Sequence, residues 1–530
     1  KYYTSYVWPR DNAEENIFDH HYMDGFDDRY WESYWRAIRK VNMFLENIPT
    51  AAVRNEAARS RMIAEAKILR AYYYLLLVKW YGDIPIILDV PEFESDFAEY
   101  PKQPAWKVLQ ACVDDCEEAL DNSEVPWRLA NLSERNRMTR GTACAIISQA
   151  SLFAASKLYC HGEDLWQYAY DKNKKVYDLL VANGFKLYTD LQDDHYNSAY
   201  AELFVGSPGY PVECERIMVG RPEAPNQPNY WVWGMPIQNN YRAGTVPTQE
   251  LVDCFDVLST GKNVLDYYQP YLDEQHLKPN FNLESGYALT PEKDDNGNVT
   301  GYRETAPFRD RDLRFEAVCI HNGSTVYVGD ARSTVTTYSG GNCELRDNAR
   351  NYTRTGYYNN KFRQWYSCAN KRSADGAWVY FRFAEVMLNY AEAAVEKGDL
   401  PTAMRLINEV RHRAGFAPEV DLDPKGDRDL ARLMLRKERR TEFVFEEHRF
   451  FDNRRWTANE ENIECEKYTT GMKVTRSGIR YSYERFLVGS DGSMPSKLSY
   501  EAKWHFLPIP LSEVRTLEEK TGKKWQNYGW

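Results

Sequence analysis

Between residues 64 and 87, hydrophobic and polar positions follow the period of an amphipathic helix. The apolar and aromatic residues of its buried face recur at steps of three and four, at Ile68, Tyr72, Leu75, Leu76 and Trp80. Gly82 follows as a helix stop, and Pro85 keeps the chain extended beyond it. The pattern therefore predicts a long helix that ends at Gly82 and is followed by an extended segment.

The same helical period recurs in eight segments of the chain. They are residues 28–47, 53–81, 104–121, 140–159, 165–183, 378–397, 400–414 and 428–448. Short loops make neighbouring helices antiparallel, and the segments are rich in Ala with bulky partners, so that small residues let helices approach closely while large ones fill the gaps. Such pairs are typical of tetratricopeptide-like arrays, although no strict period of about 34 residues is visible. We predict a mostly α fold built on a helix-pair scaffold.

Residues 184–375 lack this period and are dense in Gly, Pro, Asn, Tyr and Trp. A short helix is predicted at 247–256 with Thr248 as its N-cap, and the Asn-Gly pair within 292–302 predicts a hairpin turn. A block of this length is too long for a structureless connection, so we expect an irregular lobe with short strands. Loops of this kind are where binding residues tend to lie.

These segments predict one domain over residues 1–530 rather than several. An N-terminal helical scaffold at 1–183 is followed by the irregular, ligand-binding lobe at 184–375. The C-terminal scaffold helices follow at 376–456, and a tail with an extended Pro-rich stretch occupies 457–530.

Composition narrows the range of functions. The net charge of −11 argues against nucleic-acid binding, which needs a concentrated basic face. No run of about 18 apolar residues is present, so no spanning helix is expected, and the opening KYYTSYVWPRDNAEEN has the character of an interior start. The ten Cys form no CxxC pair, and Cys112 and Cys116, one helical turn apart, are expected as buried thiols rather than as a disulfide.

Sequence motifs for catalysis and metal binding are missing. There is no His-Glu-x-x-His, no Gly-x-Ser-x-Gly and no phosphate-binding Gly-rich loop. His20 and His21 are adjacent, and adjacent residues rarely bind one ion together. Residues 294–298 are oxygen-rich like a calcium loop but lack its closing Glu, so a plain hairpin turn is favoured. We expect no catalytic residue, no metal and no cofactor.

Four segments resemble, in order, the signatures of one known family. The first is Leu69-Arg70-Ala71 with Tyr81-Gly82-Asp83-Ile84-Pro85; the second is Arg382-Phe383-Ala384-Glu385 continuing to Tyr390-Ala391-Glu392-Ala393, Ile407-Asn408-Glu409-Val410-Arg411 and Arg413-Ala414-Gly415; the third is ERRTEFVFEEHRFFDNRRW at 438–456; the fourth is Pro508-Ile509-Pro510 with Gln526-Asn527-x-Gly529. A weaker match is Asp310-Arg311-Asp312-Leu313-Arg314. Together they bracket nearly the whole chain, which resembles the SusD-like (RagB/SusD) nutrient-binding lipoproteins of Bacteroidetes outer membranes.

Three positions depart from the family pattern. Glu447 stands where the family usually has Gly, Tyr528 replaces a Pro, and Trp530 replaces an aromatic that is usually Tyr. All three lie in structural motifs, so they bear on the fold rather than on the ligand. The lipid-bearing N-terminal Cys of the family is not in this sequence, so anchoring in the outer membrane is implied by the resemblance alone.

The charged pattern in residues 438–456 is interpreted as structural rather than catalytic. Arg439 and Glu442 lie three residues apart, and Arg449, Asp452 and Arg455 repeat that spacing. We expect buried Arg–carboxylate pairs that lock helices together.

The resemblance implies a non-catalytic, surface-exposed protein that binds oligosaccharide or polysaccharide and delivers it to a SusC-like TonB-dependent transporter. Sugars present apolar faces, which aromatic rings cover, and hydroxyls, which Asn, Asp, Gln and Arg bind. Three aromatic and polar clusters have this makeup and are the candidate ligand residues. They are Tyr6, Trp8, Arg10, Asp11 and Asn12; Tyr230, Trp231, Trp233, Gln238, Asn239, Asn240, Tyr241 and Arg242; and Tyr357, Tyr358, Trp365 and Tyr366 with Arg354 and Arg363.

Three alternatives stay open at the level of sequence. RagB-type relatives serve peptide uptake, and the signatures do not separate peptide from sugar. A glycoside hydrolase on a helical scaffold needs only two facing carboxylates about 5–10 Å apart. A pure protein-interaction scaffold would present a long concave groove instead of an aromatic pocket.

Overall fold

The structure is a computed structural model of the chain. It describes residues 29–92, 95–129, 134, 137–205, 211–220, 235–238, 243, 246–328, 331–346, 352–363, 378–457, 468–489 and 502–530. Everything below concerns these residues.

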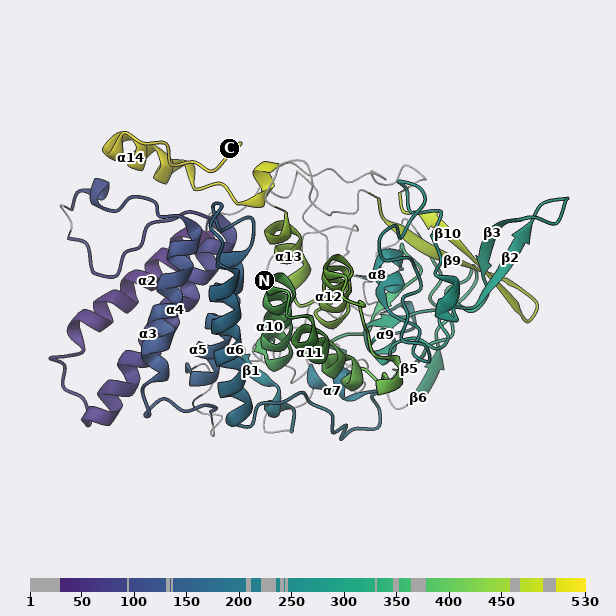
Figure 1. Cartoon of the computed structure of the whole chain (residues 1–530), viewed down its shortest axis with the longest axis horizontal. Helices are drawn as coiled ribbons and strands as arrows, with labels where there is room; N and C mark the ends of the chain where they lie inside the picture. The colour runs from purple at the N-terminus through teal and green to yellow at the C-terminus, as the bar shows by residue number, and fades with distance from the viewer. Residues whose placement is uncertain are drawn as a thin grey trace.

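Helices are the main regular structure of the described chain, and its long helices form one array (Figure 1). The array consists of α2 (Arg29–Asn47), α3 (Glu56–Tyr81), α4 (Ala105–Leu120), α5 (Arg140–Ala155), α6 (Trp166–Ala182), α10 (Phe383–Lys397), α11 (Leu400–Arg413) and α12 (Arg428–Glu442). Each helix packs on the next in this order. The predicted mostly α fold with stacked helix pairs is confirmed.

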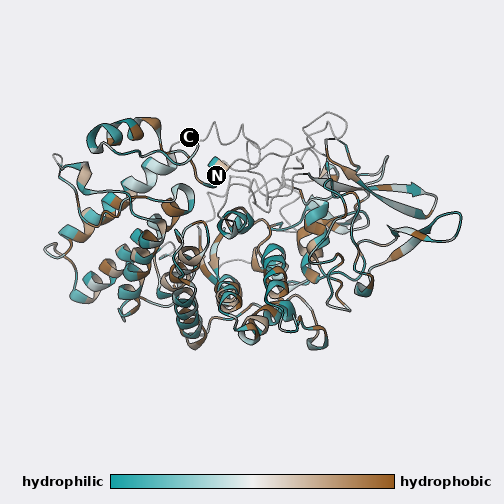
Figure 2. Ribbon diagram, turned by 45° about the horizontal axis from the view of Figure 1, so that its top comes forward, coloured by the Kyte–Doolittle hydropathy of each residue, from teal (hydrophilic) through white to brown (hydrophobic). Residues whose placement is uncertain are grey.

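The helices form one continuous array, although the irregular segment separates α6 from α10 in the sequence. Helix α6 packs directly on α10, and α5 also contacts α10, although the irregular segment lies between them in the sequence. Helix α5 is buried along almost its whole length, because its Ala, Gly and Ser residues let its neighbours approach from several sides. The other helices carry both hydrophobic and hydrophilic residues, as the brown and teal along them show (Figure 2). No described helix combines the length and the apolar character needed to cross a bilayer.

Local signals set the ends of α3. Asn55 caps its first turn by accepting a hydrogen bond from the Ala58 amide at 2.8 Å. Gly82 ends it with a φ of +69°, and the tail covers this end, since the Asn527 side chain donates to the Tyr81 carbonyl at 3.0 Å. The predicted helix stop at Gly82 is confirmed.

The lobe contains short helices and small antiparallel sheets. Its elements and those of the tail are α7 (Ala199–Leu203), α8 (Gln249–Cys254), α9 (Leu313–Val318), α13 (His448–Trp456), α14 (Leu511–Thr521), β1 (Arg216–Val219), β2 (Leu289–Lys293), β3 (Val299–Glu304), β4 (Cys319–Ile320), β5 (Thr325–Val328), β6 (Ala331–Thr334), β7 (Tyr358–Asn359), β8 (Val379–Arg382), β9 (Thr470–Ser477) and β10 (Arg480–Leu487). In the described residues the strands pair as β1–β8, β2–β3, β4–β7, β5–β6 and β9–β10. Two long hairpins, β2–β3 and β9–β10, extend from the end opposite α2 (Figure 1).

Two predicted features of the lobe are confirmed. Thr248 caps α8 by accepting from the Leu251 amide at 3.4 Å, and the Asn-Gly pair turns the chain between β2 and β3. In that turn the Asp294 carboxylate accepts from the Asn296 and Asn298 amides at 2.9 and 2.8 Å. These bonds identify residues 294–298 as a side-chain-stabilised turn. Cys112 and Cys116 are buried free thiols, as predicted.

Two predicted helix boundaries are wrong. The helix predicted at 378–397 begins only at Phe383, because Val379–Arg382 form strand β8 against β1. The helix predicted at 428–448 ends at Glu442, since Phe445 and Glu447 adopt positive φ values of 59° and 67°. Helix α13 then starts again in a new direction after Glu447.

The left-handed backbone at Glu447 gives a testable expectation about stability. Non-Gly residues pay a steric cost in this conformation, and Gly does not. We expect Glu447→Gly to raise the free energy of unfolding by about 1 kcal/mol, as measured by urea denaturation. Half-exposed Glu409, within helix α11, is the matched control, because there Gly should destabilise the protein by a similar amount. Equal destabilisation by the two changes would contradict the expectation.

A buried ionic network joins the array to the lobe. The Glu442 carboxylate, 0% exposed, binds Arg314 of α9 at 2.8 Å and also pairs with Arg382 of β8 and Arg413 of α11. The predicted buried Arg–carboxylate pairing is confirmed: Arg455 pairs with Asp452 at the three-residue spacing of the sequence, whereas Arg439 has a different partner. Arg439 pairs with Asp452 at 2.9 Å, and not with Glu442 on its own helix.

The second part of the network holds α13 against α10. Arg455 pairs with Asp452 at 2.8 Å and with Glu392 of α10. The flanking guanidinium groups hold the pKa of the Asp452 carboxyl well below its usual range. Charges this deep in the protein are tolerated only because each has an opposite charge within hydrogen-bonding distance.

Candidate functional site

A small hydrophobic cluster inside the lobe, which we call the lobe hub, contains Tyr358 of the third aromatic cluster and residues that flank the second cluster in the sequence. Its buried members are Met235, Ile320, Val326, Val335, Cys343 and Tyr358, and Ile237, Ala243 and Val328 pack around it. These residues come from β4, β5, β7 and three loops. The hub therefore fixes where several loops of the lobe start and end.

The second aromatic cluster is attached to the hub through its described neighbours. Met235 is 1% exposed, and Ile237 and Ala243 pack beside it. Gln238 ends a short turn of 3₁₀ helix that starts at Pro236. The remaining candidates, Tyr230, Trp231, Trp233, Asn239, Asn240, Tyr241 and Arg242, lie outside the described residues.

The third cluster reaches the same hub, but two of its tyrosines are core residues. Tyr357 is 0% exposed and its hydroxyl donates to Gln249 Oε1 at 2.6 Å. Tyr358 is 1% exposed and its hydroxyl donates to the Cys343 carbonyl at 3.2 Å. Neither ring is available to a ligand in this structure, so the expectation that they contact ligand is corrected. Burial also raises the pKa of both hydroxyls.

The other members of that cluster are placed only in part. Arg363 is 9% exposed, and its Nε donates to Asn360 Oδ1 at 3.1 Å, while Arg354 is half-buried. Trp365 and Tyr366 lie outside the described residues, and so does the whole first cluster of Tyr6, Trp8, Arg10, Asp11 and Asn12. Among the described residues, Met235, Ile237 and Ala243, which lie next to the second cluster in the sequence, thus pack in the same hub as Tyr358 of the third.

Three buried carboxylates, those of Asp253, Asp256 and Glu304, are paired with cationic side chains. Arg485 binds Asp253 at 2.6 Å and Glu304 at 2.9 Å, and Asp256 pairs with Arg411 at 2.6 Å. Neighbouring cationic side chains hold the pKa values of Asp253 and Asp256 below their usual range. Buried, ionised and paired carboxylates of this kind stabilise the fold and are closed to a substrate.

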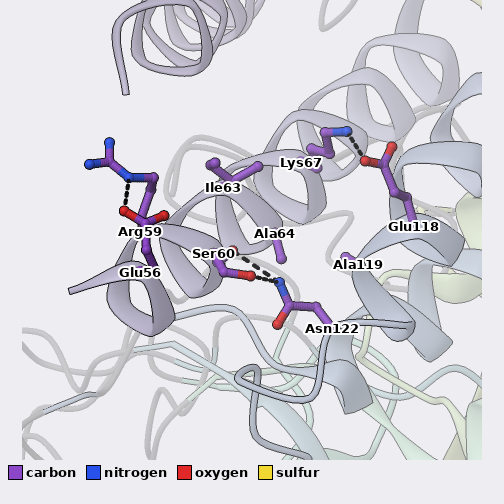
Figure 3. A pocket seen from close by; sticks show the side chains of 9 residues that line it. All are labelled: Glu56, Arg59, Ser60, Ile63, Ala64, Lys67, Glu118, Ala119 and Asn122. Atoms are coloured by element: carbon purple, nitrogen blue, oxygen red, sulfur yellow. Dashed lines mark hydrogen bonds and ion pairs between the residues drawn. The ribbon is translucent and has the colours of Figure 1, made fainter. Parts of the chain in front are cut away.

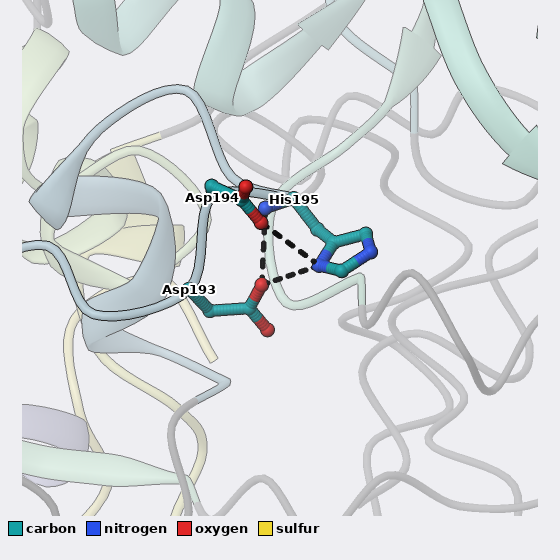
Figure 4. A group of neighbouring side chains, drawn as sticks. All are labelled: Asp193, Asp194 and His195. Atoms are coloured by element: carbon teal, nitrogen blue, oxygen red, sulfur yellow. Dashed lines mark hydrogen bonds and ion pairs between the residues drawn. The ribbon is translucent and has the colours of Figure 1, made fainter.

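Asp193, Asp194 and His195 form a group that the sequence analysis missed (Figure 4). Their potential metal-ligand atoms lie within 4.8 Å of one another. The Asp193 carboxylate accepts from the His195 backbone amide at 3.0 Å and lies 2.6 Å from its Nδ1. This is the bonding of a local Asx turn, which accounts for the grouping without an ion. The Asp-Asp-His tripeptide was the signal available in the sequence.

An open pocket of about 270 Å³ lies between α3 and α4, at the far end of the array from the two long hairpins (Figure 3). Lys67 pairs with Glu118 across it, and the Asn122 side chain donates to Ser60 Oγ at 2.8 Å. Among the described residues, no aromatic side chain lines it. The pocket has paired polar groups rather than a surface for stacking a sugar.

Comparison with known proteins gives a consistent result. A model of the SusD family matches residues 218–530. A second family model, described as starch-binding associating with outer membrane, matches residues 3–153. No curated protein is detectably similar to the chain.

Solved structures share the fold over nearly the whole chain. A SusD-like protein from Bacteroides fragilis is 25% identical, with a TM-score of 0.70 over 96% of this chain and 87% of its own. A SusD-like carbohydrate binding protein from Bacteroides fragilis is 21% identical, with a TM-score of 0.61 over 93% and 86%. Surface glycan-binding protein A from Bacteroides uniformis is 18% identical, with a TM-score of 0.52 over 94% and 84%.

Proposed function

Because the chain belongs to the SusD family, we propose that it binds a glycan at the cell surface and passes it on without chemical change. The observation that carries this proposal is the family match over more than half of the chain, together with relatives described as carbohydrate-binding and glycan-binding. We propose that the glycan is passed to a SusC-like TonB-dependent transporter in the outer membrane. An N-terminal lipid would hold the protein in the same membrane.

The arrangement of the lobe supports this function. Sugar binding needs aromatic faces and polar groups held in place before the ligand arrives. The lobe hub holds described residues that neighbour two of the aromatic segments in the sequence, namely Met235, Ile237 and Ala243 beside one and Tyr358 at the start of the other. We propose that the helical array is the frame, and that the loops around the hub and the N-terminal segment carry the ligand surface.

Affinity electrophoresis tests the function directly. The purified chain is run in native gels that contain amylopectin, xylan, polygalacturonate or mucin, with bovine serum albumin as the non-binding reference. We expect retardation in at least one gel. A chain that runs unretarded in all four gels, or that releases shorter products from the polysaccharide it binds, contradicts the proposal. If no gel retards the chain and calorimetry shows that it binds mixed peptides, peptide uptake would be favoured instead.

The candidate aromatic residues are tested by Trp8→Ala and Trp231→Ala. One lost stacking contact should weaken binding about fivefold, since such a contact contributes on the order of 1 kcal/mol. The dissociation constant is measured by calorimetry with oligosaccharides of the polysaccharide that retards the parent chain. Wild-type affinity in either variant would remove that residue from the site.

A further inference from the structure

The hairpin β9–β10 presents one continuous side-chain face toward the lobe. Its register pairs Met472 with Arg485, Val474 with Tyr483 and Arg476 with Tyr481. Alternation along a strand places these six side chains on the same face.

Near the base of the hairpin this face is covered. Met472 is 1% exposed and Val474 is 4% exposed. Arg485 is tied to Asp253 of α8 and to Glu304 of β3 by the ion pairs described above. The lobe therefore covers this face of the hairpin along the half that lies nearest the base.

Toward the turn the same face emerges from the lobe. Tyr481 is 42% exposed, and Arg476 beside it is exposed as well. Tyr338, from the loop that follows β6, packs against Tyr481 with ring centroids 6.0 Å apart and planes tilted by 35°. The two rings form a half-open aromatic surface on the hairpin β9–β10 and the neighbouring loop.

Hydrogen bonds hold this surface in place. Arg476 Nη1 donates to the Tyr338 hydroxyl at 2.7 Å, and its Nε donates to the Gly478 carbonyl at 2.9 Å. The Gly341 amide donates to the Tyr338 carbonyl at 2.8 Å. On either side of Tyr338, Val335 and Cys343 are buried in the lobe hub. The ring is thus presented by a loop that is anchored at both ends.

The chemistry of this surface matches that of a sugar. Two tilted aromatic faces can cover the apolar side of a pyranose, and Nη2 of exposed Arg476, for which the described residues offer no acceptor, can donate to its hydroxyls. Within the described residues the Tyr481 hydroxyl makes no hydrogen bond, so it is also available to donate or accept.

We propose that Tyr338, Tyr481 and Arg476 form a glycan-contacting platform in addition to the aromatic clusters predicted from the sequence. This inference rests on the proposed function and extends it by assigning a second point of contact for the same class of ligand. A long glycan could then touch the protein at the platform and at the loops around the hub at once. Two linked contacts on one chain raise the overall affinity above that of either alone.

The variant Tyr481→Ala tests the platform in the gel that retards the parent chain. We expect its dissociation constant for that polysaccharide to rise about fivefold. For Tyr481→Phe, which keeps the ring, the dissociation constant should rise by less than half as much. Tyr268→Ala is the matched control, because Tyr268 is 59% exposed and lies in a loop outside the hairpin. This variant should bind the polysaccharide as the parent does. Circular dichroism confirms that each variant is folded.

A second readout reports contact rather than affinity. Hydroxyl-radical footprinting should show Tyr481 protected when the polysaccharide is bound and Tyr268 unchanged. If the parent chain binds but Tyr481→Ala binds equally well and Tyr481 is unprotected, the platform is overturned and the proposed function stands. If the parent chain binds none of the four polysaccharides, both are overturned.

Discussion

Replacing Glu442 by Ala is expected to lower the free energy of unfolding by about 3–5 kcal/mol, the usual cost of removing one partner from a buried ionic network. Its carboxylate is 0% exposed and neutralises guanidinium groups of Arg314, Arg382 and Arg413. Those cations hold the pKa of the Glu442 carboxyl well below its usual range. Ala leaves them in the protein interior with one negative charge fewer.

Urea denaturation followed by tryptophan fluorescence measures this loss. Glu409→Ala is the control, because Glu409 also pairs with an Arg, at 2.7 Å, but on the surface of α11, where such a pair contributes about 0.5 kcal/mol. A Glu442 variant within 1 kcal/mol of the parent would show that the network is not needed for stability. Glycan affinity of the folded fraction should stay close to that of the parent, since Glu442 is remote from solvent.

The ion pairs of Glu442 connect the array to the lobe. Its partners come from α9 in the lobe, β8 at the return of the chain, and α11 in the array. A loop that binds ligand can be held in a fixed geometry only if the frame beneath it is rigid. The buried charges therefore serve binding indirectly, by fixing the lobe on the helices.

The sequence was sufficient for the parts of the fold whose causes are local. Gly82 and Thr248 mark helix ends through their own backbone and side-chain chemistry, and the Asn-Gly turn makes its own hairpin. The break after Glu442 was not predictable in this way. Phe445 and Glu447 take left-handed backbone angles where Arg382, far away in sequence, donates to the Glu442 carbonyl at 2.9 Å. Helical periodicity contains no information about such a partner.

The candidate site shows the same limit for aromatic residues. Composition marks Tyr357 as a ligand residue, yet its place beside Gln249 in the core makes it a packing residue. Tyr338 and Tyr481 carried no local signal, because their pairing depends on how a loop and a hairpin from different parts of the chain meet. A Tyr becomes a platform or a core residue according to tertiary contacts, and those are absent from a single-sequence pattern.

A second buried carboxyl group, that of Glu385, should make the free energy of unfolding depend on pH near neutrality. Glu385 of α10 is 2% exposed and accepts a hydrogen bond from Gln149 of α5 at 2.6 Å. Lys79, Arg439 and Arg382 are the cations that act on it, but burial dominates and raises its pKa from 4.5 to about 7. The pKa of nearby His448 is lowered by burial to about 3, so this imidazole is neutral throughout the range of interest.

The sign of the effect follows from proton binding. Between pH 4.5 and 7 the folded chain holds the Glu385 proton and the unfolded chain does not, so the stability associated with that proton is complete below pH 4.5 and is lost as the pH rises through 7. A shift of this size corresponds to about 3 kcal/mol. Gln at position 385 cannot titrate and should still accept the hydrogen bond from Gln149.

We therefore expect the free energy of unfolding of Glu385→Gln, relative to the parent, to increase by about 3 kcal/mol between pH 4 and pH 8. Urea denaturation of both proteins at closely spaced pH values measures this difference, and Glu409→Gln on the surface should change by less than about 1 kcal/mol over the same range. The comparison cancels every other titrating group that the two chains share. A difference that stays flat from pH 4 to pH 8 would show that Glu385 is ionised in the folded protein and that its surrounding cations, rather than burial, determine its charge.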